Sequence, residues 1–283
     1  VAFYQWYLKK QYGWICLKGK PNFNLLKDRN SYVLTEIAWT VFSSTDMIVL
    51  SIFVSTQLSS VYSVYNMIFA NINVLINSVA VSISYILGKT YHEDIKKYEV
   101  VHDSLTSLYL GIMTILMSVC YILIIPFVKL YTKDIADINY VYSSLPIMFC
   151  LVQLLSWSRN VSGNLTGIAG YAKSTSYISL AEAFINLILS IILVQIYGIN
   201  GVLLATVIAL PLKVIWCVYI SDKKVLKRSF VKSIKILGVN YLLFFVVVLI
   251  SPMLNITINS YLKFVFWGMI CTIIIGTLGI VLN

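Results

Sequence analysis

Long apolar stretches recur along almost the whole chain, and short polar segments separate them. A helix that crosses a bilayer needs about 20 consecutive, mostly apolar residues. No stretch alternates between apolar and polar residues with a period of two, which excludes barrel strands. The sequence therefore predicts an all-α integral membrane protein with about eight transmembrane helices. The predicted spans are residues 31–54, 60–87, 104–128, 141–166, 174–197, 200–220, 236–252 and 260–282.

Composition and charge agree with this prediction. The chain is 59% hydrophobic and only 11% charged, whereas soluble domains carry about 25% charged residues. Its net charge is +10, which in a soluble protein would suggest nucleic acid as a partner. The basic residues gather instead in alternate connections between spans, chiefly 9–30, 88–103 and 221–235, while the opposite connections hold only Lys129 and Lys133.

This distribution indicates an orientation, because basic residues are enriched in cytoplasmic loops. It predicts that the N-terminal loop and the C-terminus are cytoplasmic, in a multi-pass protein of the cytoplasmic membrane. It also explains the net charge without any nucleic-acid partner.

The first residues, Val1–Leu8, form an apolar run that lysines follow rather than precede, the reverse of a signal peptide. We interpret this run as the end of a helix whose beginning is missing. The chain is therefore expected to be the C-terminal portion of a longer protein. In the basic segment 9–30, lysines alternate with apolar residues such as Trp14 and Phe23. Either part of this segment lies on the inner leaflet, or it is a solvated linker.

Ionisable side chains inside spans are functional candidates, because each costs about 2.5–3.5 kcal/mol on insertion scales. Asp46 and Glu182 lie deep in the first and fifth spans, and we favour a functional role for both. Glu36 lies near the cytoplasmic end of its span, where a solvated end position is an equally good interpretation. Arg159 and Lys213 either face the protein interior or extend to the headgroups.

A line of polar side chains follows one face of the second span. Such a line faces either water in a cavity or polar partners on other helices, and we favour the cavity. At the helical period, the line consists of Ser59, Asn66, Asn73, Asn77 and Ser84, with Tyr62 beside it.

The sequence shows no motif of an enzyme or of a metal site. It has no Gly-rich phosphate loop and no nucleophile elbow, and its five cysteines lack the spacing of metal ligands. His92 and His102 lie with Glu93, Asp94 and Asp103 in a predicted cytoplasmic loop, which we interpret as solvated. We therefore expect a protein that is not an enzyme and that holds no cofactor and no metal.

Three segments carry a resemblance to a known family. Segment 45–68, TDMIVLSIFVSTQLSSVYSVYNMI, resembles the first span, outer turn and second span of the C-terminal half of polysaccharide flippases. Segment 126–142 resembles their outer loop. Segment 158–209 resembles their next helix pair and the following helix, with an Arg-Asn, a Gly before a Lys-Ser-Thr turn, and a Gly-x-x-Gly-Val turn. Over residues 31–235 the chain is thus similar to Wzx-like flippases of the multidrug/oligosaccharidyl-lipid/polysaccharide (MOP) exporter superfamily.

The resemblance implies two six-helix lobes that rock around a central cavity. Residues 31–222 would be the C-terminal lobe, 223–283 a basic cytoplasmic loop with two additional transmembrane helices, and 1–30 the end of a preceding helix with a basic cytoplasmic loop. Family members move lipid-linked oligosaccharide units across the cytoplasmic membrane for surface polysaccharide such as capsule or O-antigen. The implied partners are an undecaprenyl-pyrophosphate-linked oligosaccharide, membrane lipids, the missing N-terminal lobe and a polysaccharide polymerase.

The resemblance also suggests roles for individual residues. Arg159 matches a basic position of the family pattern, and we expect it, helped by Lys173, to contact the pyrophosphate. The sequence departs at Lys213, where many relatives have an Arg, and lysine lacks the planar fork that suits phosphate. The expected substrate path comprises Arg159, Asn66, Asn73, Asn77, Asn186 and Lys173, and the expected ion-coupling residues are Asp46, Glu182 and Glu36.

Other interpretations remain open. A multidrug or metabolite exporter of the same superfamily would be driven by a cation and would carry no lipid. A membrane enzyme of the polysaccharide-polymerase or acyltransferase type is less favoured, because the chain has no large basic outer loop and no His within a predicted span. A third interpretation is a truncated, non-functional half, because a single lobe cannot enclose a two-lobe cavity. Such a fragment should transport nothing unless it dimerises or pairs with its missing half.

Overall fold

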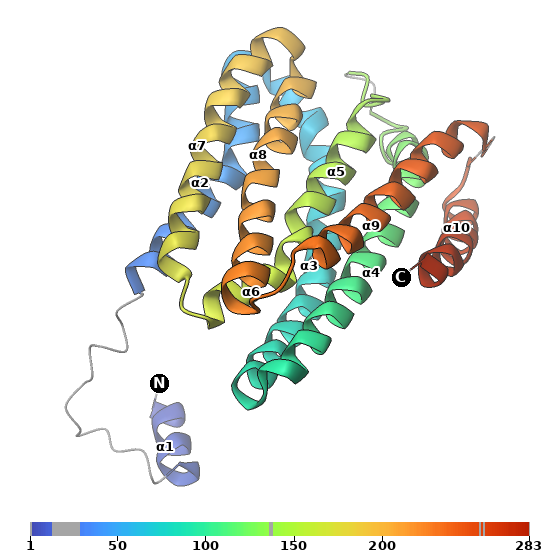
Figure 1. Ribbon diagram of the computed structural model, residues 1–283. Coiled ribbons are helices and arrows are strands. Elements are labelled where there is room, and N and C mark those ends of the chain that lie inside the picture. The colour runs from blue at the N-terminus through green and yellow to red at the C-terminus, as the bar shows by residue number, and fades with distance from the viewer. Residues whose placement is uncertain (1, 13–28, 136–137, 255, 257, 283) are drawn as a thin grey trace.

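The computed structural model describes residues 2–12, 29–135, 138–254, 256 and 258–282, and every element in these residues is helical (Figure 1). The basic segment 9–30 lies largely outside them, so both of its interpretations stay open. The α-helices are α1 (Ala2–Gln11), α2 (Arg29–Phe53), α3 (Thr56–Glu93), α4 (Ile95–Tyr131), α5 (Leu145–Ser158), α6 (Asn160–Ile168), α7 (Ala172–Tyr197), α8 (Ile199–Tyr219), α9 (Val231–Ile250) and α10 (Tyr261–Leu282). A π-helical turn, η2 (Ile220–Val225), precedes α9, and a 3-10 turn, η3 (Ser251–Met253), follows it.

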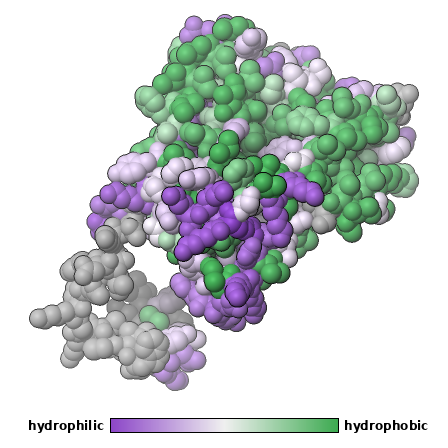
Figure 2. All heavy atoms as spheres, viewed as in Figure 1, coloured by the Kyte–Doolittle hydropathy of each residue, from purple (hydrophilic) through white to green (hydrophobic). Residues whose placement is uncertain are grey.

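Seven helices of the described chain are long and apolar enough to cross a membrane, namely α2, α3, α4, α7, α8 with η2, α9 and α10. Large apolar side chains are freely exposed on them, as at Leu262 (86%) and Ile273 (66%). Figure 2 shows apolar residues over much of the bundle and hydrophilic ones gathered at its lower end. Exposed apolar surface of this extent marks a surface that another apolar phase covers, so the chain is a multi-pass membrane protein.

The fourth predicted span, 141–166, differs from its prediction because it consists of two shorter helices, α5 and α6, that meet at Arg159. The hydroxyl of Ser158 donates to the carbonyl oxygen of Leu154 at 2.6 Å and lies 2.9 Å from the hydroxyl of Tyr241 in α9. A hydroxyl that bonds the carbonyl four residues back tends to bend a helix. The break therefore has a local cause beside Arg159.

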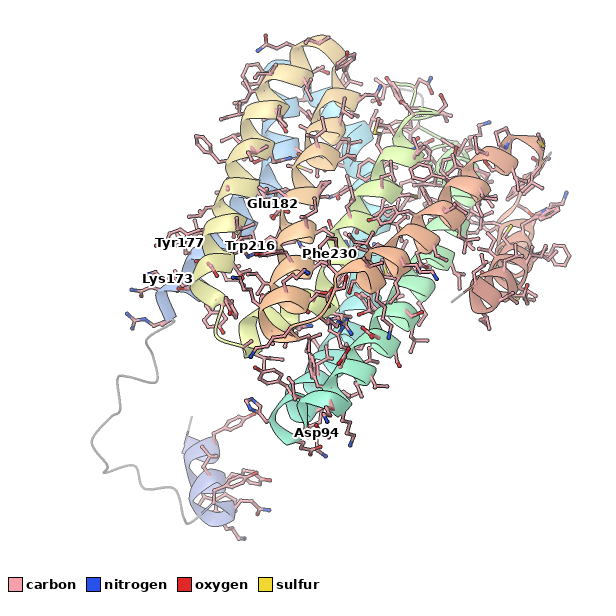
Figure 3. All side chains as sticks on the ribbon, viewed as in Figure 1. Asp94, Lys173, Tyr177, Glu182, Trp216 and Phe230 are labelled. Carbon is pink, nitrogen blue, oxygen red and sulfur yellow. The ribbon has the colours of Figure 1, made fainter. Side chains whose placement is uncertain are left out.

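The prediction of a loop over 88–103 was wrong. Helix α3 continues to Glu93 and α4 begins at Ile95, so only Asp94 separates them, at the tip of the hairpin (Figure 3). The Asp94 carboxylate accepts from the backbone N–H of Lys96 at 2.8 Å and so caps α4. With 38 and 37 residues, both helices are about 55 Å long at about 1.5 Å per residue. They extend well beyond a hydrocarbon core of about 30 Å.

The helices of the bundle pack around α4, α5 and α8 (Figure 1). Helices α2, α7 and α8 contact one another, α5 packs on α8 and α4, and α9 and α10 both pack on α4. At the centre, the Phe149 ring of α5 stacks on Tyr65 and Phe69 of α3, with centroid distances of 5.9 and 5.3 Å, and tilts against Tyr62 at 5.1 Å. These rings fix α3 against α5 and so position the polar face of α3.

Glycines allow α7 and α8 to fold closely against each other. Gly198, between them, has a φ of +55°, a conformation that side chains disfavour. A Cβ on Gly201 would lie only 2.1 Å from the carbonyl oxygen of Leu193. The tight turn keeps the two helices in register, and so Asn186 of α7 lies beside Thr206 of α8.

Candidate functional site

A cavity of about 920 Å³ lies among α2, α3, α5, α6, α7 and α8. Its charged lining residues are Glu36, Asp46, Arg159 and Lys213, and amides, hydroxyls and aromatic rings form much of the rest. Charged side chains at bilayer depth are retained where they face water or partner groups inside the protein. The cavity is therefore the candidate site for a polar solute inside the membrane.

Amide side chains of α3 line this cavity, at Asn66, Asn73 and Asn77. The Asn73 Oδ1 also accepts a hydrogen bond from the indole nitrogen of Trp157 in α5 at 2.8 Å. Both interpretations of the polar line thus apply, because it faces the cavity and one of its members joins two helices. Asn66 and Asn77 make no such bond with any described residue. Their amides are available to a ligand.

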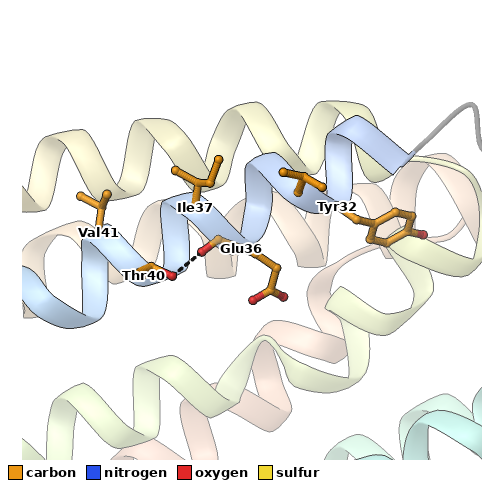
Figure 4. Close-up of a pocket in the computed structure, with 6 residues that line it drawn as sticks. Tyr32, Glu36, Ile37, Thr40 and Val41 are labelled. Carbon is orange, nitrogen blue, oxygen red and sulfur yellow. Dashed lines mark hydrogen bonds between the residues drawn. The ribbon is translucent and has the colours of Figure 1, made fainter. Parts of the chain in front are cut away.

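Glu36 lies at the cavity and also borders a groove of about 450 Å³ along α2. In Figure 4, Ile37 and Val41 project on one side of α2 and the Glu36 carboxylate on the other. The Thr40 hydroxyl donates to the backbone carbonyl oxygen of Glu36 at 2.9 Å, so it does not engage the carboxylate. Glu36 is exposed, in line with a position near the wet end of its helix.

Arg159 and Glu182 form a buried ion pair at the cavity wall. An Nη of Arg159, at the junction of α5 and α6, donates to Oε1 of Glu182 in α7. The two side chains are 11% and 4% exposed, so the guanidinium does not extend to the headgroups. A guanidinium has five N–H donors in a fixed fork, and the bond to Glu182 uses one of them. Glu182 thus holds the fork in place beside the cavity.

Lys213 of α8 lines the same cavity, half-buried. The sequence left open whether it faces the interior or the headgroups, and the structure places it in the interior. Within the described part of the chain, its ammonium group forms no ion pair. Lys213 is therefore a cavity cation that no described carboxylate pairs with directly, although its sequence context had put a phosphate role in doubt.

Asp46 is the centre of a buried polar cluster that joins four helices. The Tyr62 hydroxyl of α3 donates to Asp46 Oδ2 at 3.0 Å, and the Thr206 hydroxyl of α8 lies 3.2 and 3.3 Å from the two carboxylate oxygens. Asn186 of α7 donates to Thr206 Oγ1 at 2.7 Å, and its own side-chain oxygen is buried without a described partner. The Asp46 carboxylate is thus held by hydroxyl groups, and no basic side chain of the described residues pairs with it.

Two expected substrate-path residues are not in the cavity wall. Asn186 is fully buried in the Asp46 cluster. Lys173 is exposed in the first turn of α7 and points away from the bundle (Figure 3), although its neighbour Ala172 lines the cavity. At the ends of the polar line, Ser59 bonds the carbonyl of Ser55 and Ser84 that of Ala80.

Two residues that complete the site gave no signal in the sequence. Thr206 lies within an apolar run, and Trp157 lies in a span whose break was not predicted. Hydropathy does not distinguish them from other residues of a membrane helix, because it cannot show which spans are neighbours. Only their contacts to Asp46 and Asn73 reveal them.

A second polar cluster lies outside the cavity, at the end of the bundle that holds the α3–α4 tip. His102, interpreted from sequence as solvated, is fully buried: its ring nitrogens lie 3.3 Å from an oxygen of Asp103 and 3.3 Å from the Ser221 hydroxyl. The interpretation failed because α4 continues through this segment and η2 covers it. Burial alone would lower the pKa of Arg228, but its hydrogen bonds to Asp103 and Asp222 raise it above its usual value.

No group of three or more His, Cys, Asp or Glu side chains in the described residues forms a metal site. Four of the five cysteines are described, and all four are free thiols. Cys150, Cys217 and Cys271 are buried, in agreement with a role as apolar core residues.

Comparisons with known proteins identify the fold. The sequence matches no protein-family model and no curated protein. Among solved structures, the chain is similar to the lipid II flippase MurJ in an inward closed conformation, with a TM-score of 0.64 and 18% sequence identity. The match covers 96% of this chain and 63% of the MurJ chain, so the chain spans less than two thirds of that protein's length. The chain is therefore a membrane protein with the fold seen in the MurJ structure, and this is the fold that the resemblance predicts.

Proposed function

We propose that this chain forms part of a flippase that carries lipid-linked oligosaccharide units across the cytoplasmic membrane for surface polysaccharide. The observation that carries the proposal is the cavity, where amides and two cations lie together inside an apolar lobe. A glycan and its pyrophosphate cannot enter hydrocarbon, whereas the lipid tail can remain there. A polar cavity within the bilayer meets both requirements.

The two ends of the cargo require different side chains. The amides of Asn66 and Asn77 suit sugar hydroxyls, because an amide both donates and accepts. Arg159 and Lys213 suit the pyrophosphate, Arg159 with directed donors and Lys213 as a point charge. Glu36 also lines the cavity, and its carboxylate disfavours an anion placed directly beside it. We expect the phosphates to bind near Lys213 and Arg159, and the sugars along α3.

We further propose that a second, N-terminal lobe completes the transporter. Residues 31–222 would form the C-terminal lobe, and 223–283 a basic connection and a helix hairpin that packs on α4. The coverage of MurJ, 63% of its chain, supports a larger transporter. In this arrangement the lobes rock around the cavity and expose it to each side of the membrane in turn, with the C-terminus in the cytoplasm. A polysaccharide polymerase would then receive the cargo.

The Asp46 cluster would couple this movement to an ion. Its donors come from three other helices, so binding a proton or a sodium ion at Asp46 would change how α2 packs against α3, α7 and α8. Glu182 is a weaker candidate, because Arg159 already neutralises it. Glu36 lies outside this cluster.

A cation-driven multidrug or metabolite exporter is the second candidate. The observation that favours it is that the cavity wall also holds the carboxylates of Glu36 and Asp46, which suit a cationic solute. The two proposals predict opposite charge preferences for the cargo. A transport assay therefore separates them.

The test uses proteoliposomes that contain the chain together with its N-terminal lobe. A fluorescent undecaprenyl-pyrophosphate glycan is added, and dithionite reduction reports its arrival in the outer leaflet. R159Q and K213Q should each slow transport by at least about tenfold, since a hydrogen bond to a charged group contributes about 1.5–3 kcal/mol. K129Q removes the same charge from the far end of α4 and should leave the rate unchanged. Transport of a cationic dye without any movement of the glycan lipid would refute the flippase and favour the exporter.

A further inference from the structure

The connection between α8 and α9 is strongly basic. Residues 220–235 hold six lysines and arginines and a single acid, Asp222. Asp222 is fully buried, so no carboxylate of this segment reaches its surface. The exposed face of the connection is therefore purely cationic.

Buried ion pairs hold this connection against the bundle. Arg228, with a side chain only 12% exposed, donates to Asp222 at 2.8 Å, to Asp103 of α4 at 2.8 and 2.5 Å and to Glu99 at 3.1 Å. Lys232, in the first turn of α9, lies 2.6 Å from the second oxygen of Asp103. A guanidinium shared among three carboxylates has little freedom. The connection is thus an ordered surface, unlike an ordinary flexible linker.

Three lysines point outward from this ordered surface. Lys223, Lys224 and Lys227 are exposed, and none forms an ion pair with a described residue. Lys227 has a φ of +53°, an unfavourable conformation for a residue with a side chain, and it directly precedes the anchored Arg228. The lysine next to the anchor is thus held in a defined backbone conformation.

Apolar side chains are exposed beside the lysines. Phe230 is 39%, Val231 63% and Ile234 50% exposed, where α9 begins its passage through the membrane. The Lys223 ammonium group lies 5.3 Å from the centre of the Phe230 ring. Cations beside exposed apolar groups at a membrane boundary match the headgroup and upper acyl region of an anionic lipid. A nucleic acid or an acidic protein would meet the lysines but leave the apolar groups without a partner.

We propose that Lys223, Lys224, Lys227 and Phe230, the basic linker surface, form a binding site for anionic phospholipid headgroups of the adjacent leaflet. The lysines contact the phosphate, and Phe230 with Val231 contacts the upper acyl chain. This site is separate from the transport cavity and does not depend on the proposed cargo.

The test is a lipid titration of the full chain, purified in detergent and followed by native mass spectrometry. The probe is phosphatidylglycerol, with phosphatidylcholine as the zwitterionic reference. The triple variant K223Q/K224Q/K227Q should bind phosphatidylglycerol at least about tenfold more weakly, since each lysine near a membrane surface contributes about 1 kcal/mol. Unchanged thermal unfolding midpoints establish that the variants are folded.

The matched control is K89Q/K96Q/K97Q, which removes three charges at the α3–α4 tip. There Lys89 and Lys97 lie 3.8 and 4.0 Å from Glu93. The control should stay within about twofold of the unaltered chain, because this tip extends well beyond the hydrocarbon core and attraction to a headgroup falls off over about 10 Å. An equal loss in both triple variants would reduce the effect to general electrostatic attraction and overturn the site. Tighter binding of a soluble polyanion, such as a short oligonucleotide, than of phosphatidylglycerol would also overturn the site.

Discussion

Asp46 differs from the other charged residues of the cavity because only neutral donors surround it. Arg159 has Glu182, and Lys213 faces open space, but the Asp46 carboxylate is held by hydroxyls from Tyr62 and Thr206. Neutral donors stabilise a carboxylate less than a cation does. Under the proposed function, Asp46 is therefore the buried carboxylate at which we expect a coupling ion to bind.

Replacing Asp46 by Asn tests this at a single side chain. D46N keeps the shape and removes the charge, so transport in the proteoliposome assay should lose its dependence on an imposed sodium or proton gradient. D134N makes the same change at an exposed position outside the cluster and should behave as the unaltered protein. If D46N combined with E182Q kept both the transport rate and the ion dependence, coupling through these carboxylates would be abandoned.

For single residues, the sequence predicts which side chains are unusual in a membrane span, but not which of them contact one another. Asp46, Glu182 and Arg159 stand out because charge is rare inside a span, and the α3 asparagines stand out through helical period. The Arg159–Glu182 pair joins residues 23 positions apart, and the Thr206–Asp46 contact joins residues 160 apart. Such pairings depend on which helices are neighbours, and a single sequence does not contain that information.

Among the helices, the α7–α8 hairpin depends most directly on residue size. Gly201 allows α8 to lie against the Leu193 carbonyl of α7, and the contact lies on the turn that sets the register of both helices. The same hairpin places Glu182 behind Arg159 and Asn186 beside Thr206. A shift of this turn would therefore disturb the cavity wall and the Asp46 cluster together.

A pair of glycine variants measures this dependence. G201A places a Cβ 2.1 Å from the Leu193 carbonyl oxygen and must displace backbone, so we expect a clearly lower thermal unfolding midpoint. G238A, in α9, meets nothing within 4 Å. It should be neutral or more stable by up to about 1 kcal/mol, the difference in helix propensity between glycine and alanine. Equal midpoints for the two variants would show that α7 and α8 are not in close contact.

Hydropathy located the membrane helices well, and it failed where the helix geometry changes without a change in hydropathy. The last predicted span, 260–282, nearly coincides with α10. The break at Arg159 was missed because the apolar run continues on both sides of it. The prediction of a loop over 88–103 failed for the opposite reason. The segment is polar, but its residues belong to the ends of α3 and α4, which extend past the bilayer.

For the whole molecule, the charge distribution predicts which end faces the cytoplasm. The α3–α4 tip, the α8–α9 connection and the C-terminus should lie on that side. Lys133, just after α4, should lie on the other side.

Cysteine labelling in intact cells checks this orientation. In a cysteine-free background, K133C should react with a membrane-impermeant maleimide, whereas K97C should react only after permeabilisation. Both positions are exposed, so reactivity reports the side of the membrane rather than burial. The reverse pattern would invert the topology and the direction of transport inferred from it.

The length of the α3–α4 hairpin has a mechanical consequence. Because a single residue joins two helices of about 55 Å, the hairpin acts as a stiff lever whose membrane half carries Asn66 and Asn73 and whose tip lies outside the bilayer. A tilt of about 10° would displace the end of such a lever by about 10 Å. Since α9 and α10 pack on α4, we expect such a tilt of the hairpin to move the last two helices with it. The displacement is largest at the far tip, where a spectroscopic distance measurement can detect it.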